Sequence, residues 1–176
     1  MNTLRLFPLR YVSFAGVIFF VASLTAFGQR SDGNKVYYES GEVHYEYGLE
    51  RGVLKGITKE YYKDGKVRFE WSYQEGMLQG TSKEYYADGK LKAEWNYADG
   101  KLQGTSTLYY ANGAKKYVME YDQGAKNGWT KEYYESGQVK NEWPFKRGRV
   151  DGVVKGYTEG GDLIAEWNYS NGNYND

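Results

Sequence analysis

Polar and apolar residues alternate over short stretches that return every 24 residues along the chain. In residues 90–97, Lys-Leu-Lys-Ala-Glu-Trp-Asn-Tyr, every second side chain is apolar, and the stretch 24 residues earlier has Val67, Phe69, Trp71 and Tyr73 at the matching places. An alternation with period two predicts a β-strand with one buried face. The chain therefore contains the same predicted strand many times.

Three series of glycines keep the same spacing, and the first glycine of each unit defines position one of the repeat. Self-similarity at a period of this size indicates a repeat protein whose units are stable only when they stack. Six copies fit, over residues 35–55, 56–79, 80–103, 104–127, 128–151 and 152–175. The series are Gly56, Gly80, Gly104, Gly128 and Gly152; Gly41, Gly65, Gly89, Gly113, Gly137 and Gly161; and Gly52, Gly76, Gly100, Gly124, Gly148 and Gly172.

A turn signal precedes each alternating strand, for example Asp64-Gly65 and Asp88-Gly89. Asx-Gly favours a two-residue type I′ loop, in which both residues need positive φ. Each repeat is therefore predicted to be a β-hairpin in which position four lies opposite position fifteen and position six opposite thirteen.

This register predicts cross-strand ion pairs between a lysine at position four and a glutamate at position fifteen. Copy four has Thr107 and Val118 at these positions, so both partners change together. An exposed pair contributes only about 0.2 to 1 kcal/mol, so its role is to fix the register. The predicted pairs are Lys59–Glu70, Lys83–Glu94, Lys131–Glu142 and Lys155–Glu166.

The connections between repeats, around Gly76 and Gly100, are predicted to be four-residue loops because the alternation of strand faces excludes a second two-residue loop. This spacing places Trp71 opposite Gly80, where the indole covers bare backbone. The copies then join into one antiparallel meander. The predicted fold class is all-β, an elongated, solenoid-like sheet of twelve strands and about 55 to 60 Å in length.

Copies four to six depart from the pattern. Lys126 occupies an apolar position and Met119 replaces the tryptophan, which marks either a weak repeat or a joint or partner contact. Pro144 removes a backbone donor from its strand. The polar residues 174–176 are expected to cap the sheet.

Residues 1–28 stand outside the repeats. Two arginines precede an apolar run over residues 11–27, and small residues precede Gln29, as is typical of a secretory signal peptide. An uncleaved anchor is the alternative, since about 17 apolar residues approach the shortest membrane span. Residues 29–34 form a short linker before the repeats of residues 35–176. The mature protein is expected to be exported to the periplasm, the cell surface or the medium.

Composition narrows the function classes. The chain has 20 tyrosines and 23 glycines in 176 residues, which favours strands and turns over helix. Without residues 1–28 it has 21 basic and 23 acidic residues, which argues against nucleic acid as a partner and disfavours a membrane surface. The absence of cysteine excludes disulfides and thiolate chemistry, and His44 is the only histidine.

No catalytic residue, metal site or cofactor is predicted. An enzyme needs unlike groups that converge, whereas a regular ribbon repeats the same groups side by side. Asp88-Gly89 and Asp99-Gly100 lack the ligand spacing of a calcium loop and are explained as turns.

Position six is tyrosine in all six copies, and the alternation places it opposite the tryptophans and beside the bases at position thirteen. Such a row either binds sugar rings or a protein partner, or stiffens the sheet through cross-strand aromatic pairs. The candidate binding residues are Tyr37, Tyr61, Tyr85, Tyr109, Tyr133 and Tyr157, with Arg68, Lys92, Lys116 and Lys140.

Tandem hairpins with Tyr-Tyr-x-x-Gly, an alternating strand and a second glycine turn resemble MORN-repeat proteins. The chain is similar to the bacterial MORN-variant repeats of YwqK-type proteins, which carry the label of an antitoxin component. The resemblance covers Lys35 to about Asn173, and copies four and six depart most, with Thr158 in place of the second tyrosine. It implies a β-solenoid-like scaffold for interactions, without catalysis.

Three functions are consistent with the sequence. The first is an exported, non-enzymatic scaffold that binds another protein. The second is a module that binds cell-wall glycan, since choline-binding repeats are also tandem aromatic hairpins, although their Gly-Trp start occurs here only at Gly128-Trp129. The third, from the family label, is an antitoxin-like component. The partner and the oligomeric state are left open.

Overall fold

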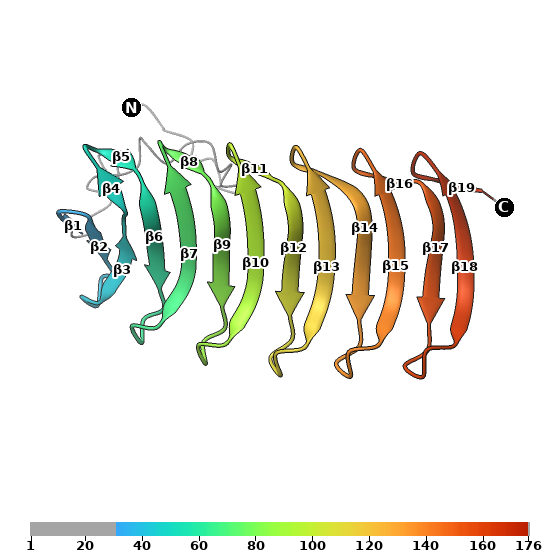
Figure 1. The fold of residues 1–176 in the computed structure, drawn as a ribbon. Coiled ribbons are helices and arrows are strands. Elements are labelled where there is room, and N and C mark those ends of the chain that lie inside the picture. The colour runs from blue at the N-terminus through green and yellow to red at the C-terminus, as the bar shows by residue number, and fades with distance from the viewer. Residues whose placement is uncertain (1–30, 176) are drawn as a thin grey trace, which may run out of the picture.

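The computed structural model describes residues 31–175, and the predicted signal peptide lies outside the described residues. Within this part, the strands form one 17-stranded antiparallel sheet and a separate two-stranded sheet. Figure 1 shows the long, bowed strands side by side in chain order, as a meander that runs along a ribbon. No helix among residues 31–175 is long and apolar enough to cross a membrane.

Each repeat contributes two main strands, and the connections add short ones, which is why there are more strands than the twelve expected. The first strands are β2 (Lys35–Tyr37), β6 (Gly56–Tyr61), β9 (Gly80–Tyr85), β12 (Gly104–Tyr109), β14 (Ala125–Tyr133) and β17 (Gly152–Tyr157). The second strands are β3 (Val43–Glu46), β7 (Val67–Gln74), β10 (Leu91–Ala98), β13 (Lys115–Asp122), β15 (Val139–Lys146) and β18 (Leu163–Ser170). The short strands are β1 (Ser31–Asp32), β4 (Leu49–Glu50), β5 (Val53–Leu54), β8 (Met77–Leu78), β11 (Lys101–Leu102), β16 (Arg149–Val150) and β19 (Asn173–Asn175). The predicted all-β meander is confirmed.

The turn inside each hairpin has a three-residue loop, so the predicted type I′ turn at Asp88-Gly89 is wrong. The Tyr86 amide donates to the Lys90 carbonyl and the Gly89 amide to the Tyr86 carbonyl, both at 2.8 Å. Of residues 86–90, only Gly89 has positive φ, which identifies a type I turn followed by a G1 bulge. The Asp88 carboxylate accepts the Lys90 amide at 3.0 Å and so stabilises this form.

The two-residue type I′ loop occurs instead between the repeats, where a four-residue loop was predicted. Asp99 and Gly100 have φ values of 48° and 76°, and their neighbours Ala98 and Lys101 pair across the loop. The five connections between copies and the loop after copy six all have this pair of positive φ values. They are Arg51-Gly52, Glu75-Gly76, Asp99-Gly100, Gln123-Gly124, Arg147-Gly148 and Asn171-Gly172.

A β-bulge at position thirteen accommodates both turns in one sheet. Tyr85 pairs with Leu91, whereas Glu84 pairs with Ala93, so Lys92 is an extra residue on its strand. The bulge restores the predicted pairing of positions four and fifteen, but position six lies opposite twelve rather than thirteen. The bulged residues of the six copies are His44, Arg68, Lys92, Lys116, Lys140 and Ile164.

The predicted register of the charged pairs is confirmed. The ion pairs Lys59–Glu70, Lys131–Glu142 and Lys155–Glu166 have N–O distances of 3.4, 2.7 and 3.4 Å. Lys83 lies opposite Glu94 in the same register, as Thr107 lies opposite Val118 in copy four. The joint change of Thr107 and Val118 therefore reflects a true cross-strand contact.

The tryptophan at position sixteen lies opposite the hydroxyl residue at position three, and not opposite a glycine as predicted. Across the junction between copies two and three, Glu70 pairs with Lys83, so this register puts Trp71 opposite Ser82 rather than Gly80. Between copies four and five, Met119 pairs with Thr130 in the same way. The glycine at position one is required instead by its backbone, since φ in this series runs from 74° at Gly104 to 127° at Gly152.

The main core cluster lies on the tryptophan face, between the first copies and their connecting loops. Because a single layer of sheet covers each side chain from one side only, few side chains are fully buried. The cluster consists of Val36, Tyr47, Leu54, Tyr73 and Leu78, with Tyr45, Trp71 and Tyr97 packed against it.

Candidate functional site

The position-six tyrosines lie on the face opposite the tryptophans, the face that also carries the lysine–glutamate pairs. Each of four hydroxyls donates to the glutamate at position fifteen of the preceding repeat. In copy five Tyr133 has Val118 at the corresponding place. The four bonds are Tyr61–Glu46, Tyr85–Glu70 and Tyr109–Glu94 at 2.8 Å and Tyr157–Glu142 at 3.0 Å.

These hydrogen bonds change the acidities of both partners. Burial, followed by the bond to the glutamate, raises the pKa of Tyr61 and of Tyr85 to about 12. The Tyr61 hydroxyl is the main cause that holds the pKa of Glu46 below its ordinary value. The tyrosine row thus joins successive repeats through hydroxyl–carboxylate hydrogen bonds rather than through the aromatic pairs that were expected, and ligand binding by this row stays a prediction.

Replacing Tyr61 with phenylalanine should raise the pKa of Glu46 towards its ordinary value, because the carboxylate loses its strongest hydrogen bond. A group with a lowered folded-state pKa contributes stability above its unfolded pKa, and this stability is lost as the pH falls through the folded-state pKa. Carboxyl carbon NMR titration measures the shift. Tyr174→Phe is the control, and an unchanged Glu46 titration in Tyr61→Phe would refute the role of the bond.

The bases at position thirteen lie on the tryptophan face, so the expectation that they flank the position-six tyrosines is wrong. Lys92 pairs with Glu84 at 2.6 Å, and Glu84 lies opposite Ala93 on that face. The bulge is the reason, because an extra residue reverses the alternation of faces at this point. Arg68 and Lys140 likewise pair with Glu60 and Glu132, at 2.9 and 3.3 Å.

The same bases lie over the second tyrosine of the Tyr-Tyr doublet, at position seven. Their charged groups are 5.3 to 5.8 Å from the ring centroids, within the range of cation–π attraction. The structure therefore brings together a row of bases and a row of tyrosines. They lie on the tryptophan face, and the tyrosines are those of position seven rather than position six. The pairs are Arg68–Tyr62, Lys92–Tyr86, Lys116–Tyr110 and Lys140–Tyr134.

The position-seven hydroxyls form a second link between repeats, which sequence reasoning missed although the Tyr-Tyr doublet was its signal. Each donates to the backbone carbonyl of position six in the next copy. Thr158 ends the series in copy six. The bonds are Tyr38–Tyr61, Tyr62–Tyr85, Tyr86–Tyr109, Tyr110–Tyr133 and Tyr134–Tyr157, at 2.6 to 2.9 Å.

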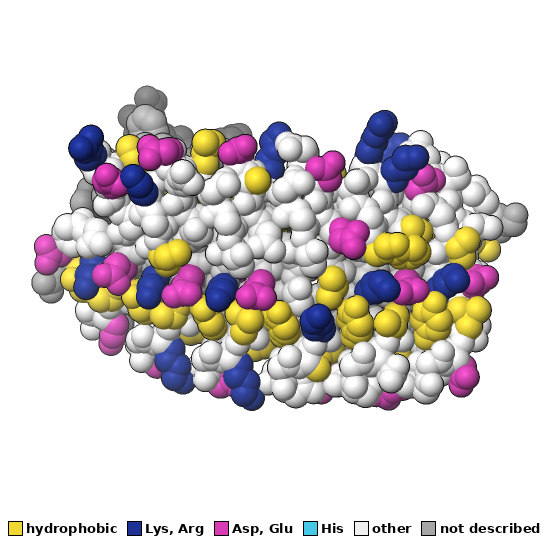
Figure 2. Space-filling model, in the orientation of Figure 1, with side chains coloured by type: hydrophobic (Ala, Val, Ile, Leu, Met, Phe, Trp, Pro, Cys, Tyr) yellow, Lys and Arg dark blue, Asp and Glu magenta, His cyan; other side chains and the backbone are white. Residues whose placement is uncertain are grey.

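The face with the charged pairs contains an apolar interruption. Figure 2 shows a row of alternating basic and acidic side chains along this face, broken by hydrophobic ones. The break lies where Thr107 and Val118 replace the lysine and the glutamate, and Val118 lies opposite Lys131 of the next copy. On the same face, two residues from Lys131, Trp129 pairs with Pro144. We name Thr107, Val118, Trp129 and Pro144 the Trp129 patch.

Trp129 is held at the surface by its backbone. It stands at position two, which is Ile57, Thr81, Thr105 or Val153 in other copies, and it is 42% exposed. Its amide donates to Glu120 at 3.0 Å, and a Cβ at Gly128 would overlap the same carboxylate. The site therefore presents an exposed indole beside an exposed carboxylate.

The sequence of these hairpins matches the model of a known family, described as MORN repeat variant. The match covers residues 54–75, 78–99, 102–123, 126–147 and 150–171. The chain belongs to the MORN repeat variant family. MORN repeats commonly mediate protein interactions and generally form non-enzymatic scaffolds. A comparison with curated proteins found no matching relative.

The first matched MORN repeat begins at residue 54, near the end of copy one, and copy one itself has a polar cluster around the single histidine. His44 stacks on Tyr38 at 4.0 Å, and its Nε2 is 3.6 Å from a Glu60 oxygen that Arg68 also contacts at 2.9 Å. Burial raises the pKa of Glu60, and burial together with Arg68 lowers that of His44. The guanidinium thus holds the carboxylate in an ion pair, as in the neighbouring MORN repeats.

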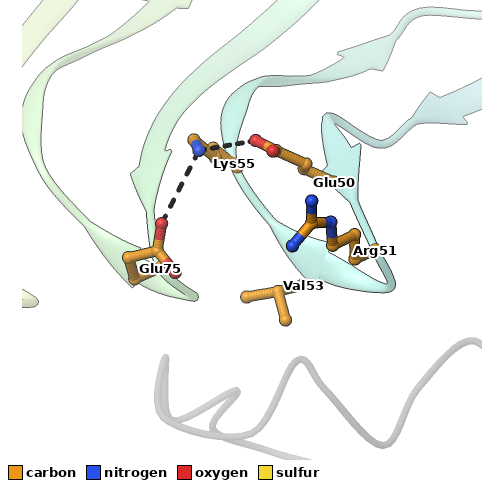
Figure 3. A pocket seen from close by; sticks show the side chains of 5 residues that line it. All are labelled: Glu50, Arg51, Val53, Lys55 and Glu75. Carbon is orange, nitrogen blue, oxygen red and sulfur yellow. Dashed lines mark ion pairs between the residues drawn. The ribbon is translucent and has the colours of Figure 1, made fainter.

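A pocket of about 220 Å³ lies between the loops of copies one and two (Figure 3). It is lined by Glu50, Arg51, Val53, Lys55 and Glu75, and the Lys55 ammonium lies 2.5 Å from Glu50 and 3.7 Å from Glu75. This lining offers no nucleophile with a base beside it. Among residues 31–175, no cluster of histidine and carboxylate side chains is arranged to hold a metal ion.

Proposed function

We propose that this chain is an exported, non-enzymatic MORN-repeat scaffold that binds a protein partner through the Trp129 patch. The observation that carries the proposal is the exposed indole of Trp129, set in the apolar break of the charged row. Exposed aromatic side chains surrounded by polar residues are typical anchors of protein interfaces. The adjacent carboxylate of Glu120 favours a partner that places a positive charge beside an apolar side chain.

A regular sheet presents nearly the same surface in every copy, so a partner that binds at one place needs a feature that differs. The Trp129 patch supplies this difference. Copy four is the only copy in which the lysine and the glutamate of the charged row are replaced, by Thr107 and Val118. The engaged hydroxyls of the position-six tyrosines favour this protein-binding role over the glycan-binding alternative, since sugars are bound through free polar groups as well as ring faces.

Retention of envelope proteins on the immobilised mature chain tests the partner. A discrete protein should be retained by the unmodified chain and lost with Trp129→Ala. Met77→Ala is the matched control, because Met77 is 49% exposed and lies on the short strand β8, away from the patch. Equal retention by both variants, or no protein retained by the unmodified chain, contradicts the proposal.

Two further measurements test the glycan-binding alternative and export separately. Pelleting with purified cell-wall material, lost on Tyr85→Ala/Tyr109→Ala/Tyr133→Ala with an unchanged circular dichroism spectrum, would establish the glycan alternative instead. Export is tested by the mass of the chain in cell fractions, which should correspond to residues 29–176 in the envelope or the medium. The full-length mass in the cytoplasm would overturn export without bearing on the partner.

A further inference from the structure

Three of the five junctions between successive repeats have the same construction. The second strand of one copy pairs with the first strand of the next, so that Glu46 lies opposite Lys59, Glu70 opposite Lys83 and Glu142 opposite Lys155. The glutamate also accepts a hydrogen bond from the hydroxyl of the tyrosine two residues after that lysine, as Glu70 does from Tyr85. Each of these three junctions thus recognises an extended segment with a base and, two residues later, a tyrosine.

Strand β18 has the receiving half of such a junction. On one side it pairs with β17 along residues 163–169. On the other side, among residues 31–175, only β19 pairs with it, over Asn168, Tyr169 and Ser170. The polar cap expected at residues 174–176 therefore covers one end of the strand in the described residues and leaves the edge along residues 163–167 open.

The side chains along this edge are exposed to an unusual degree. Leu163 and Ile164 are 52% and 63% exposed, and Trp167 is 39% exposed, whereas the equivalent Trp71, Trp95 and Trp143 are less exposed. The Glu166 side chain is 47% exposed, compared with 27% for Glu70 and 17% for Glu142. The difference is the cover that a following strand gives to the internal copies.

The backbone of β18 also points towards the open edge. At position seventeen, the amides of Gly48 and Ser72 donate to the hydroxyls of Thr58 and Ser82 in the next repeat. Because backbone groups alternate sides along a strand, the amide and carbonyl two residues earlier face the same way. In β18 this residue is Glu166, so its backbone donor and acceptor are directed at the open edge.

We propose that β18 binds an extended segment of a partner protein by antiparallel strand addition. The segment has a lysine or arginine opposite Glu166 and a tyrosine two residues later, whose hydroxyl reaches the same carboxylate. Main-chain hydrogen bonds supply the affinity and the two side chains supply the specificity. This second surface goes beyond the proposed function and is independent of the Trp129 patch.

A second copy of the chain fits this edge less well than another protein does. Two β18 strands facing each other offer no basic residue to Glu166, since the strand reads Leu-Ile-Ala-Glu-Trp-Asn-Tyr-Ser. The first strand β2 has the required Lys35 and Tyr37, but β1 already pairs with Lys35 and Val36. Neither β18 nor β2 of a second copy therefore fits, and we assign the complementary segment to a different protein.

The chain's own junction strand provides the probe. A fluorescein-labelled peptide of residues 80–86, Gly-Thr-Ser-Lys-Glu-Tyr-Tyr, is titrated with the full processed chain, and fluorescence anisotropy is recorded. We expect saturable binding that Glu166→Lys weakens at least about tenfold through charge repulsion. A Lys83→Glu peptide should bind Glu166→Lys better than the unmodified peptide does. Glu159→Lys makes the same charge change on an exposed turn of copy six and should bind normally.

A peptide N-methylated at its lysine removes the backbone donor that faces β18, and its binding should also fall at least about tenfold. Trp129→Ala should leave peptide binding unchanged, so this proposal and the proposed function fail separately. Absence of binding, or binding that is indifferent to N-methylation and to Glu166→Lys, overturns the proposal. A dimer in light scattering that Glu166→Lys dissociates would assign the edge to a second copy and overturn it as well.

Discussion

Replacing Gly48 with alanine should lower the free energy of unfolding by about 3 kcal/mol, because the added methyl group meets backbone that has no room to move. A Cβ at Gly48 would lie 2.6 Å from the Lys55 carbonyl oxygen and 2.7 Å from that of Ile57. Lys55 lies in the connection between copies one and two, where its amide donates to the Gly48 carbonyl at 2.9 Å, and Ile57 lies on β6 of copy two. Relieving the clash therefore means breaking the contact that joins these copies.

Urea unfolding followed by tryptophan fluorescence measures this loss. Gly160→Ala is the matched control, because Gly160 also has no positive φ and its nearest neighbour would be Thr158 Oγ1 at 3.6 Å. The control should change stability by no more than about 0.5 kcal/mol. Equal midpoints for the two variants would show that the connection adjusts at little cost.

Truncating Leu78 to alanine should destabilise the protein by about 2 to 4 kcal/mol, since it leaves a cavity in the core between copies two and three. Leu78 is 4% exposed and pairs with Tyr73, which is itself buried. A one-layer sheet has few such side chains, so the neighbours have little material with which to refill the space.

Met77→Ala tests whether the loss comes from burial rather than from the strand. Met77 precedes Leu78 on β8, but its side chain is 49% exposed. Its replacement should lower the melting temperature far less than Leu78→Ala does. Equal shifts for the two variants would indicate that the short strand, and not the core contact, stabilises the connection.

The register of the hairpins could be predicted from the sequence because charged partners at positions four and fifteen change together. The turn types could not, since Asp-Gly is compatible with both a type I′ loop and a type I turn with a G1 bulge. Arg51 and Gln123 take positive φ in the true type I′ loops although neither residue signals such a turn. Strand pairing on both sides of each loop decides the turn, and this information is not local.

The candidate site was predicted in part. The tyrosine row was placed on the correct face, whereas the bases were not, because the bulge at position thirteen leaves no mark in the alternation of residue types. The Trp129 patch combines residues from copies four and five, and only the register brings Val118 near Trp129.

The structure explains why position seventeen of copy five can be a proline, Pro144. In copies one and two the amide at position seventeen donates to a hydroxyl at position three of the next repeat, as Ser72 does to Ser82 at 3.3 Å. Copy six has Val154 at that place, 5% exposed. Pro144 lacks the donor and Val154 lacks the acceptor, so no polar group is left unsatisfied.

The side-chain bonds of the two tyrosine rows that link the repeats join residues 15 or 23 positions apart, so each copy recognises only its immediate neighbours. The length of this protein can consequently change in evolution by duplication or loss of whole 24-residue units, each of which lengthens the ribbon by about 9.6 Å, the width of two strands. The surrounding copies would meet across the new boundary with the same tyrosines and glutamates. Loss of a single residue within a strand would instead turn every following side chain of that strand to the opposite face.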